Sequence, residues 1–538
     1  MKVSDYIVKF LEEQGVTDMF GLPGVGVGHF MNSLITLNSP IRSHLVYNEQ
    51  GAAFAACGYA QSSHSIGVCY CTAGPGGTNL VTGIANAYCD SVPMVIIHGE
   101  KDTYALRNEL KLRQKASQEV DIVGMCQPIT KWSHLITSVD EVRYVFEKAF
   151  YLANNGRPGP VLIDLPTDIQ RGDFNPEEVK GFDEPTIPNY KEESEILIKA
   201  INGSQKPLIL VGGGVRQAQK EDILLRLSKQ YNIPLVTSLV AFDIYINEPN
   251  NIGFVGMDGD IAANKAVTEC DLLITLGARL NFKQVNNNRE TFAKNAKVYR
   301  IDCDPGELEY RLRDETSICA DINYLLPQLE SLKDSIIPKD EEWLKSCQRL
   351  RKESTRRKSL NPEGDKVMNE ILSLLPEGLH ITVDTGSHRR WLIAQHQFRK
   401  DQHLYQSAGL ASMGYALPAA IGVHYATKKP TLCIDGDGGI MMNLQELQFI
   451  KRDKLPITVI VFNNHCYGDI MEFQKKVFPG NYYITTEDSG YLAADYEGIA
   501  KAFGFKYIKK NYTDTDWDLD YCHSEPQLIE IIVPSNER

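Results

Sequence analysis

The stretch Ile434-Asp435-Gly436-Asp437-Gly438-Gly439 decides how the last third of the chain is expected to fold. Residues 431–435 (TLCID) and 456–462 (PITVIVF) are typical of short buried strands, and residues 443–452 between them of a helix with one apolar face. A strand, a helix and a strand in this order form a right-handed βαβ unit with parallel neighbouring strands. Asp437 and Asn464 then lie at the carboxyl edge of the sheet, where open α/β sheets bind ligands.

The residue types at this edge point to a metal and a phosphate ligand. The Asp437 carboxylate, an asparagine amide oxygen and turn carbonyls suit a hard cation such as Mg²⁺ that also binds phosphate oxygens. The glycines at 436, 438 and 439 allow backbone amides to approach those phosphates. A glycine turn followed by an unrelated asparagine pair is the alternative interpretation.

Gly436-Asp437-Gly438 followed at this distance by Asn463-Asn464 resembles the signature of thiamine-diphosphate (ThDP) enzymes. The flanking sequence is most similar to the acetolactate synthase (acetohydroxyacid synthase) large-subunit group. This resemblance implies ThDP and Mg²⁺ as cofactors, with the side chains of Asp437 and Asn464 and the backbone carbonyl of Cys466 as metal ligands. The Cys466 thiol is too soft a group to suit Mg²⁺ itself.

Length and composition set the frame for this interpretation. The 538 residues are too many for one hydrophobic core. A net charge of −13 disfavours nucleic acid or an anionic membrane as a partner. No segment approaches 18 uninterrupted apolar residues, so no membrane span is expected. The twelve cysteines do not form a disulfide framework, which favours a reducing, cytoplasmic location.

Short apolar strands alternate with helices along the whole chain, which predicts an α/β protein of three doubly wound parallel-sheet domains. The resemblance implies that these are a pyrimidine-binding domain, a central Rossmann-like domain and a diphosphate-binding domain, in that order. Acidic, proline-bearing or highly charged stretches are predicted to be linkers. The expected boundaries are 1–171 for the first domain, 172–192 for a linker, 193–336 for the central domain, 337–362 for a second linker and 363–538 for the third domain.

Glu49 is the candidate catalytic acid. It follows an expected strand (SHLVY, 43–47) in the run Glu49-Gln50-Gly51-Ala52, which is similar to the run that holds the catalytic glutamate of the resembled family. The resemblance implies that Glu49 lies beside N1′ of the aminopyrimidine of ThDP and promotes loss of the C2 proton. Burial against an apolar helix is expected to raise its pKa and keep it protonated. A glutamate that merely favours a helix N-terminus is the alternative.

Further motifs extend the resemblance along the chain. Pro75, in the glycine turn 74–80, matches the loop against the pyrimidine ring, and Gln118 matches a catalytic glutamine of the substrate channel. Met413 matches the apolar residue that holds ThDP in its bent conformation. The remaining expected cofactor-binding residues are Gly438 and Gly439, together with Thr385, Gly386, Ser387 and His388, which lie where the resembled family holds the diphosphate oxygens.

Four positions depart from the family pattern, and the resemblance places them at the substrate rather than at the cofactor. They are Val25, Ser117, Asp469 and Phe473. An acid at 469 and a hydroxyl at 117 predict a pocket more polar than one built for two small keto acids. Neutral drift is the alternative explanation.

The central domain raises the question of FAD. Residues 256–259, 277–279 and 301–304 match the segments that hold FAD in acetolactate synthases, and Arg279 matches an arginine near the flavin. The run that follows Arg279 differs from that of the synthases, so flavin binding is left open here.

The resemblance implies decarboxylation of a 2-keto acid, with pyruvate the first candidate, and transfer of the two-carbon unit to an acceptor carbonyl as in acetolactate synthesis. The alternatives are transfer to a nucleotide-linked keto sugar, simple decarboxylation, and a non-catalytic binding protein of the same fold. A dinucleotide-dependent dehydrogenase is disfavoured because Gly212-Gly213-Gly214 lacks the spaced glycines of that fingerprint. Since the family places its cofactor between subunits, a homodimer or homotetramer is expected.

Overall fold

The computed structural model describes residues 1–107, 110–285, 290–308, 312, 314–354, 361–395, 398–517, 519–521 and 525–535. These residues form two compact units, each described by itself. Unit 1 comprises Met1–Glu184, Leu374–Arg389 and His403–Arg538, and unit 2 comprises Pro185–Ser373 and Arg390–Gln402.

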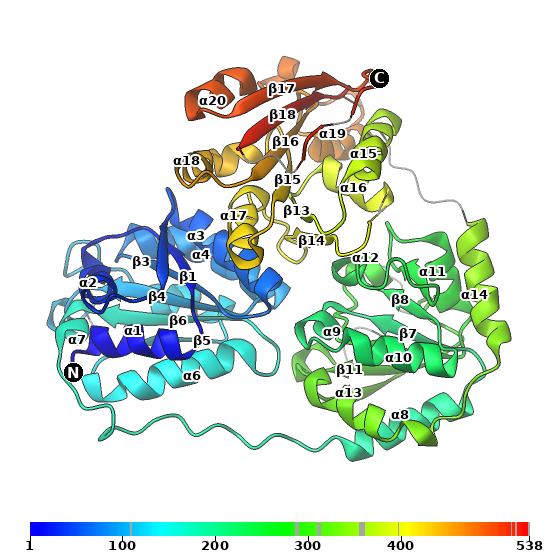
Figure 1. Ribbon diagram of the computed structural model, residues 1–538, viewed down its shortest axis with the longest axis horizontal. Coiled ribbons are helices and arrows are strands. Elements are labelled where there is room, and N and C mark those ends of the chain that lie inside the picture. Colours follow the sequence, from blue (N-terminus) through cyan, green and yellow to red (C-terminus); the bar gives the residue numbers. More distant parts are fainter. Residues whose placement is uncertain are drawn as a thin grey trace. The chain divides into compact units, whose positions relative to one another are not determined.

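The first sheet of unit 1 has six parallel strands in the order β2-β1-β3-β4-β6-β5 (Figure 1). Its side chains alternate between two apolar cores, as expected for strands buried on both faces. In β3, Cys69 and Cys71 face one core and Val68 and Tyr70 the other. The strands are β1 (Asp18–Gly21), β2 (Arg42–Leu45), β3 (Gly67–Cys71), β4 (Met94–Glu100), β5 (Trp132–Leu135) and β6 (Pro160–Pro166), and the helices are α1 (Val3–Glu13), α2 (Gly28–Thr36), α3 (Glu49–Ser63), α4 (Pro75–Asp90), α5 (Ile122–Cys126), α6 (Val142–Asn154) and α7 (Thr167–Arg171).

A second parallel sheet of unit 1 is built from the end of the chain, in the order β14-β13-β15-β16-β18-β17. The predicted βαβ unit is present in it, because β15 and β16 are parallel neighbours. The helix between them begins as a 3₁₀ turn, η9 (Leu444–Glu446), before α18. The strands are β13 (His380–Val383), β14 (His403–Gln406), β15 (Thr431–Gly436), β16 (Ile457–Asn463), β17 (Lys506–Asn511) and β18 (Gln527–Ile532), and the helices are α16 (Ser387–Gln395), α17 (Ala416–Thr427), α18 (Leu447–Arg452), α19 (Gly468–Val477) and α20 (Tyr496–Phe503).

Helices α3 and α17 join the two sheets of unit 1 (Figure 1). Both helices are rich in small residues, and their apolar side chains share one core. A Cβ atom on Gly58 would overlap the backbone of Ala419, and one on Gly422 would overlap the carbonyl oxygen of Ala55. Glycine at these two positions therefore allows the helix backbones to touch.

Unit 2 contains the third parallel sheet, in the order β12-β11-β10-β7-β8-β9. Helix α14 lies inside the stretch 337–362 that was expected to be a linker, and its Trp343 and Cys347 are buried in the core of this sheet. The charged residues of the stretch form the outer face of an amphipathic helix. Residues 355–360 of the same stretch lie outside the described residues. The strands are β7 (Pro207–Val211), β8 (Leu235–Thr237), β9 (Asn251–Phe254), β10 (Leu272–Leu276), β11 (Lys297–Asp302) and β12 (Glu315–Cys319), and the helices are α8 (Lys191–Gly203), α9 (Gly213–Gln217), α10 (Glu221–Tyr231), α11 (Ile261–Glu269), α12 (Phe282–Val285), α13 (Ile322–Ser331), α14 (Glu341–Glu353) and α15 (Pro362–Leu374).

The predicted fold class is confirmed: the described residues form three parallel sheets of six strands, each with helices around it. Within the described ranges, none of the helices has both the length and the apolar character needed to cross a membrane.

Candidate active site

The carboxyl edge of β15 and β16 brings two predicted metal ligands to the same part of the sheet. Gly436 pairs with Phe462 in register, so Asp437 and Asn464 each follow the end of one of these neighbouring strands. The backbone N–H of Asp437 donates to the carbonyl oxygen of Phe462 at 3.1 Å, which continues the pairing beyond the strand end. This local fold follows directly from the two apolar runs and the glycine turn.

Asp437 has the features of a cation ligand. Its side chain is buried, and one oxygen, Oδ1, accepts the N–H of Gly438 at 3.0 Å. The other oxygen, Oδ2, is buried and has no hydrogen-bond partner among the described residues. Burial raises the pKa of Asp437 to about 7, although the nearby Tyr491 hydroxyl and backbone N–H groups oppose the shift. A buried carboxylate oxygen without a donor is costly, and a bound Mg²⁺ would relieve that cost.

The two residues of the asparagine pair have different surroundings. Asn463 is buried and donates from Nδ2 to Oε1 of Glu530 on β18 at 2.7 Å. Asn464 is half-buried, and its Oδ1 accepts the N–H of Cys466 at 3.4 Å. Cys466 is buried and bridges to Thr486 through the backbone. Asn463 therefore links the end of β16 to β18 through its hydrogen bond with Glu530. Asn464 lies at the edge that was predicted to hold the metal.

The turn between β13 and α16 carries four predicted diphosphate-binding residues. Thr385 and Gly386 precede the helix, and Ser387 and His388 begin it. His388 is buried, its Nε2 has no partner among the described residues, and burial lowers its pKa to about 4, so its imidazole is neutral. A Cβ atom on Gly436 would lie 3.1 Å from Nδ1 of His388, which brings this turn against the glycine turn of β15.

Ser387 and Asp469 are hydrogen-bonded to each other. Oγ of Ser387 donates to Oδ1 of Asp469, in the first turn of α19, at 2.6 Å. A Cβ atom on Gly468 would lie 2.9 Å from the same Oγ and 2.8 Å from Nδ2 of Asn464. A residue predicted for the diphosphate and one predicted for the substrate are thus in direct contact beside a predicted metal ligand.

Two buried aspartates at this edge were not predicted. Asp384 accepts backbone N–H groups of Thr385 at 2.7 Å, Gly414 at 3.1 Å and Ala416 at 2.9 Å. It thereby ties the predicted diphosphate turn to the loop that carries the half-buried Met413. Burial raises the pKa of Asp384 to about 6. The second aspartate is Asp435. Its carboxylate lies so close to Gly439 that a Cβ atom on Gly439 would overlap it. Each of these aspartates directly precedes a turn that contains glycine, and this pattern in the sequence could have indicated them.

Glu49 lies at the start of α3 and is buried. Asn48 caps this helix by accepting the N–H of Gln50 at 2.9 Å. Oε2 of Glu49 accepts a hydrogen bond from Nδ2 of Asn79 at 2.9 Å, and a Cβ atom on Gly76 would lie 3.4 Å from Oε1. Glu49, the predicted catalytic acid, therefore packs against the first turn of α4. This turn belongs to the segment 74–80 that was predicted to lie against the pyrimidine ring.

The other residues predicted on the first sheet lie at its carboxyl edge or beyond it. Pro75 is exposed at the first position of α4. Gln118 has φ +69°, and its Oε1 accepts a hydrogen bond from Nζ of Lys101 at 3.0 Å. A Cβ atom on Gly74 would lie 2.7 Å from the carbonyl oxygen of Gln118, so the structure brings Gln118 beside the Pro75 turn. Ser117 is exposed.

Val25 and Phe473 are exposed apolar residues of the predicted pocket. Val25 is 80% exposed, and Phe473 on α19 is 55% exposed.

No hydrogen bond or ion pair among the described residues joins Glu49 to Asp437 or Asn464. The structure therefore groups the predicted residues into a pyrimidine half around Glu49 and a metal half around Asp437.

Glu446 links the loop after the metal half to the pyrimidine half of the same chain. It is fully buried on η9, and its Oε1 accepts the N–H groups of Tyr47 at 3.0 Å and Asn48 at 3.2 Å. These are the two residues that precede Glu49. Sequence analysis missed Glu446 because its partners lie about four hundred positions away, beyond the reach of local patterns.

Replacing Glu446 with glutamine is expected to remove part of the pH dependence of stability. Burial raises the pKa of Glu446 to about 7 from an ordinary value of 4.5. The folded chain therefore holds this proton more tightly than the unfolded chain, and stability falls between these two pH values as pH rises. The loss is on the order of 3 kcal/mol. Thermal unfolding at about pH 5 and about pH 7.5 measures it.

The Glu446→Gln variant should lose less stability over this pH interval than the wild type. Its amide oxygen still accepts the two N–H groups, and it carries no charge to bury. Glu377→Gln, at an exposed position, is the matched control and should follow the wild type. Equal pH slopes for Glu446→Gln and the wild type would contradict the explanation.

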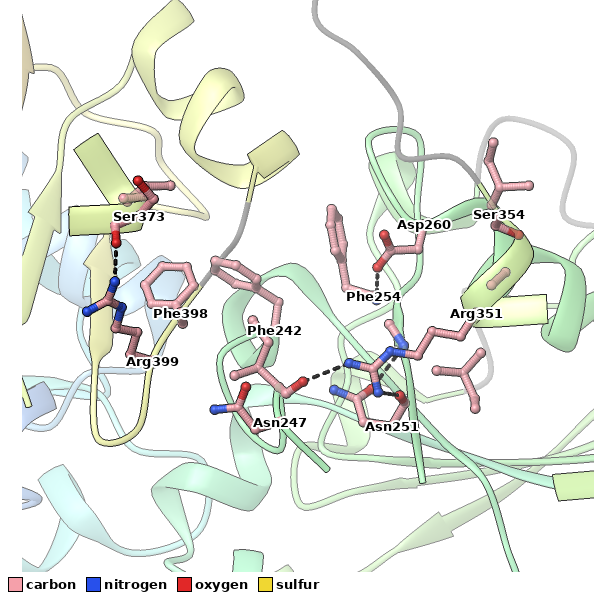
Figure 2. Close-up of a pocket in the computed structure, with 16 residues that line it drawn as sticks. Phe242, Asn247, Asn251, Phe254, Asp260, Arg351, Ser354, Ser373, Phe398 and Arg399 are labelled. Carbon is pink, nitrogen blue, oxygen red and sulfur yellow. Dashed lines mark hydrogen bonds between the residues drawn. The ribbon is translucent and has the colours of Figure 1, made fainter. Parts of the chain in front are cut away.

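Unit 2 has a cavity of about 490 Å³ (Figure 2). Phe242 and Phe398 meet edge to face across 5.3 Å, and Arg351 donates to the carbonyl oxygens of Glu248 at 2.9 Å and Ile246 at 2.8 Å. Gly253, Phe254 and Asp260 line it, so the predicted FAD segment 256–259 flanks this cavity. The other predicted FAD segments, 277–279 and 301–304, are not among its lining residues.

Comparison with known proteins covers all three sheets. The N-terminal TPP-binding domain of thiamine pyrophosphate enzymes matches residues 1–125, their central domain matches 195–329 and their C-terminal TPP-binding domain matches 384–531. The whole chain is 35% identical to acetolactate synthase isozyme 2 large subunit of Escherichia coli K12, covering 96% of that protein. It is 34% identical over its whole length to acetolactate synthase 1, chloroplastic, of Zea mays, covering 86% of that protein. Over 97% of the chain it is 35% identical to the acetolactate synthase large subunit of Porphyra purpurea, covering 90%.

Three parallel sheets, together with matches to all three domains of thiamine pyrophosphate enzymes, define an α/β enzyme of the thiamine-diphosphate class. The chain belongs to the thiamine pyrophosphate enzyme family, within its acetolactate synthase group. The resemblance stated from the sequence is thereby confirmed, and so is ThDP as the cofactor.

Proposed function

We propose that this chain is an acetolactate synthase-like enzyme. It decarboxylates a 2-keto acid, pyruvate first among them, and joins the remaining two-carbon unit to an acceptor carbonyl. Acetolactate synthases at 34–35% identity along the whole chain support this proposal. The observation that carries it is the pair of half-sites, with Glu49 against the glycine turn of α4 and the unpartnered Oδ2 of Asp437 at the edge of β15.

The residues of the metal half fit Mg²⁺ and a diphosphate. Asp437 through its buried oxygen, the Asn464 side chain and the Cys466 carbonyl would hold the ion, since all three are hard oxygen ligands. Thr385, Gly386, Ser387 and neutral His388 would bind diphosphate oxygens with Gly438 and Gly439, where a side chain would overlap Tyr467 or Asp435. Bound ThDP supplies an electron sink for loss of CO₂.

The pyrimidine half supplies proton transfer and orientation. Glu49 would hold its proton toward the aminopyrimidine, while Asn79 fixes the other side of its carboxyl group. Pro75 and Met413 would contact the cofactor rings. Gln118, held by Lys101, would approach the substrate.

We propose a homodimer or homotetramer in which the Glu49 half of one chain faces the Asp437 half of another. Large apolar side chains are exposed beside both halves, which supports an interface there. They include Val25, Phe473, Tyr483 and Leu492. Sedimentation at assay concentration should give at least a dimer, and a fully active monomer would overturn this arrangement.

FAD is tested separately from the main reaction. The visible absorbance of the purified protein measures its flavin content. One flavin per chain would assign FAD to the central domain, and protein that binds no flavin on incubation with FAD would show that the central domain does not use this cofactor.

The main test is product analysis. Protein incubated with pyruvate, ThDP and Mg²⁺ should release CO₂ and form acetolactate, identified by mass spectrometry. Acetaldehyde as the main product would indicate a simple decarboxylase. A new carbon–carbon bond formed only when a nucleotide-linked keto sugar is added would indicate the sugar alternative, which the relatives do not favour. No turnover with any acceptor would support a binding protein.

Asp469→Asn is expected to improve the use of a second 2-keto acid as acceptor. We place Asp469 at the substrate side of the metal half, where its carboxylate repels the carboxylate of an incoming keto acid. Removing the charge should lower the KM for the acceptor by about 3- to 10-fold. Asp488→Asn, at an exposed position, is the control and should leave this KM unchanged. An unchanged acceptor KM in Asp469→Asn would remove Asp469 from the pocket.

A further inference from the structure

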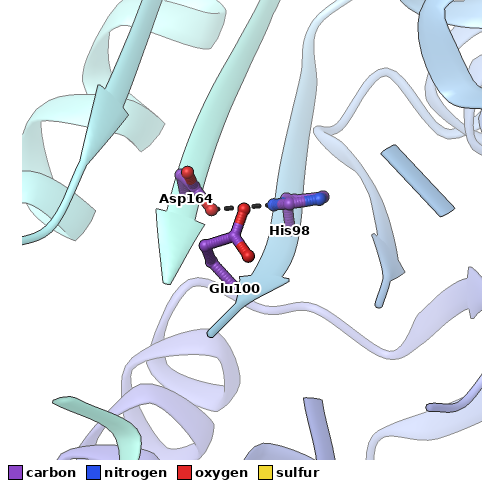
Figure 3. Close-up of side chains that lie close together, drawn as sticks. All are labelled: His98, Glu100 and Asp164. Carbon is purple, nitrogen blue, oxygen red and sulfur yellow. Dashed lines mark hydrogen bonds and ion pairs between the residues drawn. The ribbon is translucent and has the colours of Figure 1, made fainter. Parts of the chain in front are cut away.

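A buried cluster of three ionisable side chains lies at the carboxyl edge of the first sheet (Figure 3). His98 on β4 pairs in register with Asp164 on β6. Glu100 ends β4 two residues after His98, so both side chains point to the same face of the sheet. Figure 3 shows the Glu100 carboxylate reaching toward the space between Asp164 and His98. The carboxyl ends of neighbouring parallel strands are where open sheets bind ligands.

The three side chains are close and enclosed. Nδ1 of His98 is 2.7 Å from Oδ1 of Asp164, and one ligand atom from each residue lies within 4.8 Å of the other two. Exposure is 0% for His98, 1% for Glu100 and 4% for Asp164. Oε1 of Glu100 accepts the N–H of Lys101 at 2.7 Å, but Oε2 has no hydrogen-bond partner among the described residues.

The charges of this cluster are not balanced by its own members. The carboxylates of Glu100 and Asp164 bring two negative charges into a buried space, and a protonated His98 would balance only one of them. The neighbouring Lys101 directs its Nζ to Gln118. Such a group of charges is stable only if it takes up protons or a cation.

We propose that His98, Glu100 and Asp164 bind one transition-metal dication of the Zn²⁺ or Mn²⁺ class, at a site formed by residues other than those at Asp437. One imidazole nitrogen and two carboxylates match the ligand preference of these ions, whereas Mg²⁺ prefers oxygen alone. A dication neutralises the two carboxylates, and Oε2 of Glu100 is an oxygen still in need of a partner. Nδ1 of His98 and Oδ1 of Asp164 are hydrogen-bonded at 2.7 Å, so they would need to separate by less than about 1 Å for both to contact one ion at about 2.1 Å, which would replace this hydrogen bond.

The site would stiffen two elements that face the proposed reaction. Glu100 holds the backbone of Lys101, whose side chain holds Gln118. On the other side, a Cβ atom on Gly77 would lie 2.8 Å from Nε2 of His98, so the imidazole packs under the glycine turn that begins α4. This ion is therefore structural, and its binding does not depend on the reaction that the enzyme catalyses.

Metal content after removal of Mg²⁺ and ThDP tests the proposal. Wild type, Glu100→Gln and Asp437→Asn are produced with Zn²⁺ and Mn²⁺ in the medium, dialysed against EDTA and analysed by elemental mass spectrometry. Because the cluster is enclosed, wild type and Asp437→Asn should each retain about one ion per chain, and Glu100→Gln at least about 10-fold less. Wild type that retains no ion, or Glu100→Gln that retains as much as wild type, would overturn the site.

A second measurement uses the unaltered protein and does not depend on whether Glu100→Gln folds. Crystals of wild type should show an anomalous peak at the absorption edge of the retained metal, between His98 and Glu100. Crystals without a peak there would show that the three groups share protons instead. Neither experiment measures turnover. An empty metal site in an active enzyme can therefore be told apart from a filled metal site in an inactive enzyme.

Discussion

Glu49→Gln is expected to lower the rate of pyruvate decarboxylation by about 10²- to 10⁴-fold. Glutamine has the same shape as glutamate and can still accept the hydrogen bond from Asn79, so the start of α3 should keep its structure. It has no carboxyl proton to share with the aminopyrimidine. The variant should therefore bind ThDP and Mg²⁺ with near wild-type affinity and fail at the activation of the cofactor.

Two measurements separate these effects. Fluorescence titration with ThDP measures cofactor affinity, and NMR measures hydrogen–deuterium exchange at C2 of bound ThDP, which should slow together with turnover. Glu13→Gln, at an exposed position of α1, is the matched control and should behave as wild type. Wild-type turnover in Glu49→Gln would remove Glu49 from the mechanism.

Asp437→Asn is expected to weaken Mg²⁺ binding by at least about 10- to 100-fold and to weaken ThDP binding with it. The substitution keeps an oxygen that can accept the N–H of Gly438 but removes the negative charge that would hold the ion. Because burial raises the pKa of Asp437, the ionised carboxylate is costly in the metal-free protein. The metal-free variant should therefore be at least as stable as the metal-free wild type at about pH 8.

The combination of lost affinity and retained stability distinguishes a binding residue from a structural one. Calorimetric titration with Mg²⁺ and ThDP gives the affinities, and thermal unfolding without ligands gives the stability. Asp258→Asn, an exposed position in unit 2, should change neither. Undiminished Mg²⁺ affinity in Asp437→Asn would place the ion elsewhere.

The predicted strands 431–435 and 456–462 correspond to β15 and β16, which lie at the centre of their sheet and are apolar and buried. Strands without such an apolar run lie at sheet edges. Strand β17 (KYIKKN) is largely exposed, and β12 and β14 also lie at edges. An edge strand pairs on one side only, so its composition reflects solvent as much as the sheet, and propensity is a weak guide there.

Within the candidate site, the sequence indicated residues that lie on local turns at the ends of strands. It placed Asp437 and Asn464 at one edge from the order of strand, helix and strand alone. It missed Glu446, whose partners lie about four hundred positions away, and Asp384, which binds the next residue and two backbone N–H groups about thirty positions away. It also assigned Ser387 and Asp469 to different ligands, although the two side chains are directly bonded. Pairings of this kind follow from tertiary packing, which one sequence does not reveal.

The different surroundings of the two adjacent asparagines have a consequence for genetics. Asn463 supports the end of β16 through Glu530, so its replacement should reduce the amount of protein that a cell accumulates. Asn464 lies at the half-buried edge, so its replacement should leave abundance intact and abolish growth that depends on the enzyme. A library of variants scored for both abundance and growth should therefore show that Asn463 is needed for folding and that Asn464 is needed for activity.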